Sequence, residues 1–309
     1  MRQIKWWLRG LSQRFSPKFT LAALAHRTWV LEPEVALVPL LGRRNGIAVD
    51  AGANKGVYLY HLCRNYRRVI GFEPLPVLAR YLQDAAPSNA VVHAMALSNA
   101  EGAATLRLPK GYNELGSLEA HTAETWTTTA DVETHTVSLR TLDSFDLADV
   151  SLIKIDVEGH ELAVLEGAKQ TLQKWRPAVL VEVEERHSSG SVARVQSHLE
   201  AIGYSGYYLD GLILKSIDDY DVTRDQCVAN LSQSVKVGRY LNNFIFFDKR
   251  LAAERVAVIR AALRQDPPLE LGAALNPGHA VTARKRLAGS FRAARDVLIA
   301  SVPAASLRE

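Results

Sequence analysis

Residues 47–56, with the sequence IAVDAGANKG, say more about the architecture of this chain than any other stretch. An apolar run from Ile47 to Val49 ends in an acid, Asp50, and a turn that contains glycine follows at once. Residues 57–64 then have the apolar spacing of a helix. A buried strand, a glycine turn and a helix in this order open a doubly wound sheet, and such a turn lets a ligand approach the backbone closely.

The alternation continues along the chain. Strand-like apolar runs lie at 69–73, 90–97, 103–108, 134–139, 150–156, 178–183, 207–214 and 243–248, and helical patterns at 75–85, 159–175 and 192–202. This order predicts an α/β fold with a doubly wound, mostly parallel sheet. The last two runs have no long helix between them, which predicts an antiparallel late strand. We therefore expect one domain over 46–248, between a helical N-terminal extension, 1–45, and a helical tail, 249–309.

The net charge of +4 is concentrated at the ends of the 309-residue chain. Residues 249–309 hold 11 basic and 5 acidic residues, whereas 1–248 hold 26 basic and 28 acidic residues. So small a surplus excludes a dedicated nucleic-acid binder, and 48% hydrophobic residues exclude a mainly disordered chain. The sequence has two cysteines, no secretory signal and no run of about 20 apolar residues, which together predict a cytoplasmic protein.

Two basic segments are candidates for contact with the inner face of a membrane. Trp6 and Trp7 lie among Arg and Lys residues, which is typical of an interfacial helix. The alternative is a helix that packs on the fold or on a second subunit. In the tail, residues 284–286 with Arg292 and Arg295 could bind phosphates of a glycolipid or nucleotide sugar, or form a solvated helical face. The sequence leaves the oligomeric state open.

An acid ends the second strand-like run at the interval expected of a ribose-binding carboxylate. Glu73 lies 21 residues after Gly52, where it would accept hydrogen bonds from both ribose hydroxyls. The turn has the form Asp50-x-Gly52-x-x-x-Gly56. Asp50 would repel a pyrophosphate and attract the amino group of S-adenosylmethionine, so we expect this cofactor rather than NAD. The alternative is an ordinary turn in which Asp50 caps the helix.

Several motifs in the right order resemble the FkbM family of methyltransferases. They are VDAGANKG at 49–56, GFEPLP at 71–76, ALSNAEG at 96–102, IKIDVEGHE at 153–161 and VLEGA at 164–168, with Asn243 and Phe246 near the last strand. The resemblance covers roughly residues 46–248. It implies an S-adenosylmethionine-dependent O-methyltransferase on the seven-stranded, Rossmann-like sheet of class I methyltransferases. The family's substrates are hydroxyl groups of sugars, glycans, glycolipids and polyketides.

The positions that match the family's motifs are the cofactor contacts that the resemblance implies. The cofactor loop would comprise Asp50, Gly52, Asn54 and Gly56, Glu73 would bind the ribose, and Ala96 and Leu97 would pass the adenine ring. Ala51 departs from the Val or Ile that the family often has, which is a conservative change. The tail after Asp248 lies outside the resemblance, which therefore says nothing about it.

Candidates for the chemistry follow the run at 150–156. O-methylation needs a group that removes the proton from the acceptor hydroxyl, and Asp156, Glu158 and His160 lie where open α/β sheets bind ligands. His160 could accept the proton, and Glu158 could orient His160 or Lys154. The alternative is that these acids only stabilise the first turn of a helix. Lys154, expected inside the sheet, would need a carboxylate partner such as Asp156 or Glu158.

A divalent metal ion is a further hypothesis. Asp156 with Glu182 or Glu184, which follow the next strand, would supply the oxygen ligands that a hard cation prefers. The alternative is that these acids merely line the edge of the sheet. His187, just beyond them, is a second candidate base, although a lone histidine in a loop is more often solvated.

Residues 109–133 form a polar, Thr-rich segment that is too long for a routine connection. We expect it to contact the substrate, with Tyr112, Asn113, Ser117 and Trp126 as candidates for binding a sugar; the alternative is a surface loop.

Three other functions are rivals to this interpretation, and the sequence argues against two of them. A scaffold protein would keep the sheet and the cofactor but lose catalysis. An NAD-dependent oxidoreductase would need Gly-x-Gly-x-x-Gly, which the first turn lacks. A nucleic-acid methyltransferase would need a positive surface, whereas residues 1–248 hold more acidic than basic residues.

Overall fold

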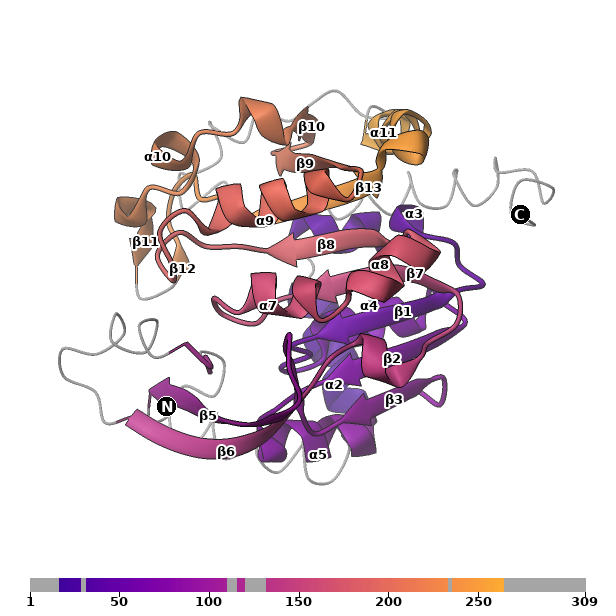
Figure 1. The fold of residues 1–309 in the computed structure, drawn as a ribbon, viewed down its shortest axis with the longest axis vertical. Helices are drawn as coiled ribbons and strands as arrows, with labels where there is room; N and C mark the ends of the chain where they lie inside the picture. The colour runs from indigo at the N-terminus through magenta and orange to yellow at the C-terminus, as the bar shows by residue number, and fades with distance from the viewer. Residues whose placement is uncertain (1–16, 29–31, 110–115, 120–131, 233–234, 264–309) are drawn as a thin grey trace.

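The computed structural model describes residues 17–28, 32–109, 116–119, 132–232 and 235–263. A central sheet has eight strands in the order β10-β9-β13-β8-β7-β1-β2-β3 (Figure 1). Its parallel part consists of β1 (Ile47–Ala51), β2 (Arg68–Phe72), β3 (Ala90–His93), β7 (Val150–Ile155) and β8 (Ala178–Glu182). β13 (Asn243–Asp248) is antiparallel to β8 and to β9 (Tyr204–Asp210). The structure thus confirms the doubly wound, mostly parallel sheet with an antiparallel late strand.

Burial explains why the strands of the central sheet could be predicted from the sequence. Every residue of β1, β7 and β13 is buried. A parallel sheet that is covered on both faces has strands with continuous apolar runs instead of alternating ones. The few polar residues within such strands are therefore conspicuous, and Asp50 and Lys154 are two of them.

The sheet has one strand more than the seven expected. The run at 207–214 is a hairpin in which β9 pairs antiparallel with β10 (Ile213–Ser216). Gly211 adopts a φ of +63° in the turn, a conformation that favours glycine in tight hairpins. The run at 90–97 also divides, because β4 (Ala96–Leu97) leaves the central sheet and pairs with β6 (Val132–Arg140). β6 pairs antiparallel with β5 (Gly102–Pro109) and completes a second, three-stranded sheet.

Helices cover both faces of the central sheet (Figure 1). One face packs against α7 (Glu161–Glu166), α8 (Lys169–Trp175) and α9 (Ser191–Ala201). The other packs against α3 (Val38–Leu41), α4 (Val57–Cys63), α5 (Pro76–Ala85) and α11 (Lys249–Leu263). The helix predicted over 159–175 is divided at Gly167, where the Ser98 carbonyl oxygen lies 1.9 Å from the point that a Cβ atom would occupy.

Short elements complete the chain. They are η1 (Pro33–Leu37), η2 (Asp143–Phe145), η3 (Ile217–Asp219), α10 (Val222–Asp225), η4 (Val228–Asn230), β11 (Leu231–Ser232) and β12 (Val235–Lys236). The last two pair as a small antiparallel hairpin.

Helices on either side of residues 46–248 pack on the same domain. α2 (Pro17–Thr28) contacts α4 and α5, and its Leu21 is buried. α11 contacts β10 and β13 and buries Val256 and Ile259 against the core. The division into a domain and two extensions stays a prediction. Residues 1–16, with Trp6 and Trp7, and 264–309, with the basic tail cluster, lie outside the described residues.

No helix in the described part of the chain is both long enough and apolar enough to cross a membrane.

Candidate active site

The turn after β1 is hydrogen-bonded to the end of β2 through its backbone. Gly52 has a φ of +79°, and the amides of Gly52 and Ala53 both donate to the carbonyl oxygen of Phe72, at 3.0 and 2.9 Å. Asn54 follows with a φ of +49°, which is uncommon for a residue other than glycine. Such backbone conformations persist only where the surrounding structure holds them, and they cluster at ligand sites.

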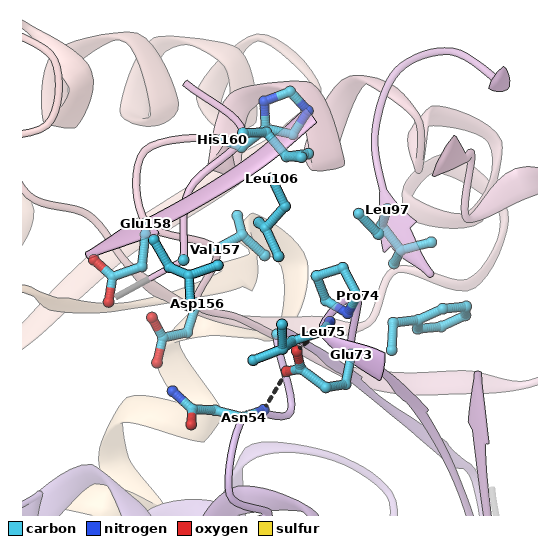
Figure 2. A pocket seen from close by; sticks show the side chains of 16 residues that line it. Asn54, Glu73, Pro74, Leu75, Leu97, Leu106, Asp156, Val157, Glu158 and His160 are labelled. Carbon is cyan, nitrogen blue, oxygen red and sulfur yellow. Dashed lines mark hydrogen bonds between the residues drawn. The ribbon is translucent and has the colours of Figure 1, made fainter. Parts of the chain in front are cut away.

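Glu73 lies directly beside this turn, at the end of β2. Its carboxylate accepts a hydrogen bond from the Asn54 amide at 2.7 Å and one from the Leu75 amide at 2.8 Å. Figure 2 shows the first of these bonds across the pocket floor. Burial raises the pKa of Glu73 to about 7, while both amide hydrogen bonds act to lower it. Two amides from different segments therefore fix the orientation of this carboxyl group.

Most of the predicted site residues line one pocket, which has about 650 Å³ of empty space including its open mouth. Of the cofactor candidates, Gly52, Asn54, Glu73, Ala96 and Leu97 line it, and so do all three catalytic candidates, Asp156, Glu158 and His160. Sequence reasoning missed Leu106 and Leu108, which also line the pocket, because their apolar pattern looked like that of any strand. Gly116 and Leu118 line it too, and they lie in the segment 109–133 that was expected to contact the substrate.

Asp50 and Gly56 are not among the residues that line this pocket. Asp50 is buried beside Lys154 of β7, and within the described residues its Oδ2 has no hydrogen-bond partner. Burial raises the pKa of Asp50 to about 7. Gly56 has a φ of +82° at the start of α4, where a Cβ would meet Leu82 and Leu21. Direct cofactor contact by either residue stays a prediction.

Asp156 follows β7 and reaches the pocket with a partly exposed side chain. Its Oδ2 lies 3.2 Å from Nζ of Lys154, which is 1% exposed. The Lys154 ammonium also lies 4.5 Å from the centre of the Tyr58 ring. The pKa of Lys154 is raised because Asp156, Glu182 and other carboxylates outweigh the burial that would lower it. The predicted pairing of Lys154 with Asp156 is therefore present.

Glu158 contacts His187 instead of orienting His160 or Lys154. Its Oε2 lies 3.2 Å from Nε2 of His187, and its backbone has a φ of +53°. Burial, reinforced by the Asp156 carboxylate, raises the pKa of Glu158 well above its usual range. Burial also lowers the pKa of His187 to about 4. At neutral pH the His187 imidazole is therefore uncharged, so this contact is not an ion pair.

Both ring nitrogens of His160 have partners. Nδ1 lies 2.6 Å from Oε1 of Glu119, and Nε2 lies 2.9 Å from the Ser98 hydroxyl. In Figure 2 the His160 ring lies well apart from Asn54, Glu73 and Asp156, on the far side of Leu106. Proton acceptance by His160 is untested, and these two hydrogen bonds compete with it.

The acids proposed as metal ligands have other partners. Asn242 donates to Glu182 at 2.7 Å and to Glu184 at 2.8 Å, and Tyr240 donates to Glu184 at 2.9 Å. Arg186 also pairs with Glu184. Within the described ranges, no three His, Cys, Asp or Glu side chains are grouped so that they could hold a metal ion.

Only a small part of the predicted substrate segment is described. Ser117 is buried and donates from its hydroxyl to the Glu158 carbonyl oxygen at 2.6 Å. Tyr112, Asn113 and Trp126 lie outside the described residues. Glu119, which sequence reasoning did not single out, binds His160.

Comparison with known proteins identifies the family of this chain. The model of the methyltransferase FkbM domain matches residues 50–205, and no curated protein matches the sequence. A methyltransferase FkbM from Methylobacillus flagellatus KT is 18% identical, with a TM-score of 0.40 over 66% of this chain and 44% of that chain. A TehB-like SAM-dependent methyltransferase from Corynebacterium glutamicum is 13% identical, with a TM-score of 0.35 over 75% of this chain and 98% of that chain.

The assignment rests on the family model, since both structural scores are too low to carry an argument. This chain spans less than half the length of the Methylobacillus protein, 44%. The match over residues 50–205 includes the glycine turn, Glu73 and the loop from Asp156 to His160. Together with the class I methyltransferase sheet, it shows that the chain belongs to the FkbM family of methyltransferases.

Proposed function

We propose that this protein is an S-adenosylmethionine-dependent O-methyltransferase. The observation that carries the proposal is the buried Glu73 carboxyl group, which the amides of Asn54 and Leu75 orient at the floor of the pocket. Each carboxylate oxygen has two acceptor sites, so one on each oxygen is left for a ribose hydroxyl. Gly52 beside it lets the cofactor approach the backbone.

The chemistry of the lining suits this cofactor better than a dinucleotide. When bound, S-adenosylmethionine supplies a methyl group on a sulfonium cation. The titratable residues that line the pocket are Glu73, Asp156, Glu158 and His160, with no Lys or Arg among the lining residues described. Carboxyl groups favour a cation and disfavour a pyrophosphate. Phe72, Ala96 and Leu97 provide an apolar wall for the adenine ring.

Asp156 is the best candidate to take the proton of the acceptor hydroxyl. It lines the pocket, its side chain is 30% exposed, and the Lys154 ammonium lies 3.2 Å from its Oδ2. Burial and the Asp156 carboxylate raise the pKa of Glu158, which disfavours its ionised form, and its Oε2 already contacts Nε2 of His187. As the acceptor oxygen takes the methyl group, its proton passes to an Asp156 oxygen, and no general acid is needed.

We further propose a sugar, glycan, glycolipid or related natural product as the acceptor, as the FkbM resemblance implies. Carboxyl and amide groups such as those of Asp156, Glu158 and Asn54 bind hydroxyl-rich molecules well, and all three line the pocket. We further propose that the enzyme works in the cytoplasm, with its basic ends at the inner membrane face.

Isothermal titration of the purified protein with S-adenosylmethionine tests the proposal. We expect binding, and we expect Glu73→Ala to weaken it by about 10- to 100-fold, because two hydrogen bonds to the ribose are lost. Glu101→Ala is the control, because Glu101 is half exposed, pairs with Arg140 and does not line the pocket. No binding by the wild-type protein, or equal binding by the Glu73 variant, would contradict the proposal.

Turnover separates an enzyme from a scaffold. The purified protein is incubated with radiolabelled S-adenosylmethionine and an extract of cell-envelope glycans and glycolipids, and transfer of label to the extract is measured. A catalytic protein transfers label, whereas a scaffold protein binds the cofactor without transfer.

A further inference from the structure

A short described segment, Gly116–Glu119, contributes two residues to the lining of the pocket. The backbone of Ser117 pairs with that of Arg107 in β5 through two hydrogen bonds of 2.9 Å each. Gly116 and Leu118, on either side of Ser117, line the pocket. The position of this segment therefore decides whether the outer wall of the pocket is complete.

Two side chains tie the segment to the loop that carries Asp156. The Ser117 hydroxyl is buried and donates to the Glu158 carbonyl oxygen at 2.6 Å. Glu119 reaches His160 at the start of α7, with Oε1 and Nδ1 2.6 Å apart. The Glu119 amide in turn donates to the Ser117 hydroxyl oxygen at 3.1 Å. The segment 116–119 is thus hydrogen-bonded to both Glu158 and His160.

The second ring nitrogen of His160 also has a hydrogen-bond partner. Its Nε2 lies 2.9 Å from the hydroxyl of Ser98, which follows β4 and is 3% exposed. The hydrogen bond with His160 lowers the pKa of Glu119, so this carboxylate is ionised at neutral pH. An ionised carboxylate only accepts hydrogen bonds, so Nδ1 carries a proton. In the neutral imidazole, Nε2 then accepts from Ser98, and no lone pair is left for an acceptor hydroxyl.

We propose that Ser98, Ser117, Glu119 and His160 form a clasp that holds Gly116–Glu119 over the cofactor pocket, and that His160 is a positioning residue in this reaction. The inference rests on the proposed function, because the ligand that the clasp retains is the cofactor. It assigns the imidazole a role other than proton acceptance and adds Glu119 to the residues that the site depends on.

The test measures binding of S-adenosylhomocysteine, the product form of the cofactor, by isothermal titration. Glu119→Ala and His160→Asn each remove the hydrogen bond between Glu119 and His160, so each is expected to weaken binding by about 5- to 20-fold. The double variant is expected to be no weaker than the weaker-binding single variant, because two changes to one contact are not additive. Glu119→Gln keeps an accepting oxygen and is expected to restore binding to within about twofold.

A matched control and a second readout guard against a general loss of structure. Glu133→Ala removes an exposed Glu–His pair from the same small sheet, with His135 at 3.0 Å, and is expected to bind as the wild-type protein does. Hydrogen–deuterium exchange of the peptide that contains residues 116–119 is expected to speed up in both clasp variants but not in Glu133→Ala.

Catalytic rate then separates positioning from proton transfer. At saturating cofactor, His160→Asn is expected to reduce the rate of label transfer by less than about tenfold, whereas loss of a general base costs about 10² to 10⁴. The clasp would be overturned if His160→Asn lowered the rate of label transfer by more than about tenfold while Glu119→Ala left it unchanged. It would also be overturned if the effects of the two substitutions on binding were additive. If wild-type protein binds and the clasp variants bind equally well, the clasp alone fails. If wild-type protein binds neither cofactor form, the proposed function fails, and the clasp's role in retaining the cofactor fails with it.

Discussion

The carbonyl oxygen of Asp156 lies 1.8 Å from the point that a Cβ atom on Gly52 would occupy. The two residues follow β1 and β7, and the Asp156 amide donates to the Ala51 carbonyl oxygen at 3.0 Å. The loop that carries the proposed base therefore rests directly on the turn that the cofactor approaches. Any side chain at position 52 would separate them.

Gly52→Ala is expected to destabilise the protein by about 3 kcal/mol or more, since it adds a steric clash to a backbone conformation that disfavours alanine. Gly102→Ala is the matched control: Gly102 has a φ of +145°, but no atom lies within 4 Å of its would-be Cβ. The control is expected to cost only the strain, about 1–2 kcal/mol. Urea unfolding measures both, and equal losses would show that the contact with Asp156 is unimportant.

The central sheet was predictable because its strands are buried on both faces and are therefore continuous apolar runs. Glu73 and Gly52 were predictable because the interval between them follows from the geometry of one strand-turn-helix-strand unit. The sheet edge was harder to predict. A hairpin whose turn depends on Gly211 reads as a single run when apolar residues continue through it.

The clasp could not be predicted, for a different reason. Glu119 and His160 are 41 residues apart, and Ser98 and His160 are 62 apart. Contacts over such distances depend on how two sheets pack, and a polar segment without periodicity carries no signal of that packing. The burial of Asp50 beside Lys154 could not be predicted from the motif either.

The stability of the protein should depend on pH through Asp50. Burial raises its pKa in the folded state to about 7, above that of the unfolded chain, so the folded state binds more protons between these two values. Its contribution is therefore present at low pH and is lost as the pH rises from about 4 to about 7. Asp50→Asn removes this titration. The variant's stability relative to wild type is expected to rise by about 1–4 kcal/mol across that window.

Urea unfolding at several pH values checks this expectation. Asp146→Asn is the control, because Asp146 is exposed and has a φ of +42°, which asparagine tolerates. Its stability difference from the wild-type protein serves as the baseline. A difference for Asp50→Asn that varies with pH no more than this baseline would contradict the assigned role of burial.

Lys154→Met is expected to destabilise the protein by about 3 kcal/mol, because it leaves the carboxyl groups of Asp50 and Asp156 without their buried cation. Lys215→Met is the control. Lys215 pairs with Asp210 at 2.7 Å but is 36% exposed, and exposed pairs contribute at most about 1 kcal/mol. Thermal unfolding of both variants measures the difference, and losses of similar size would argue against a buried ion pair.

Asp156→Asn is expected to lower the rate of methyl transfer by about 10² to 10⁴, because asparagine has nearly the same shape but cannot take the hydroxyl proton. Its binding of S-adenosylhomocysteine should change far less, because Glu73 and the Gly52 turn are intact. Asp149→Asn is the control: Asp149 precedes the same strand at its opposite end, where it pairs with Arg43 at 2.6 Å. The measurement is initial label transfer at saturating cofactor. If Asp156→Asn keeps a tenth of the wild-type rate or more, the proton goes elsewhere, and the Glu158–His187 pair becomes the next group to vary.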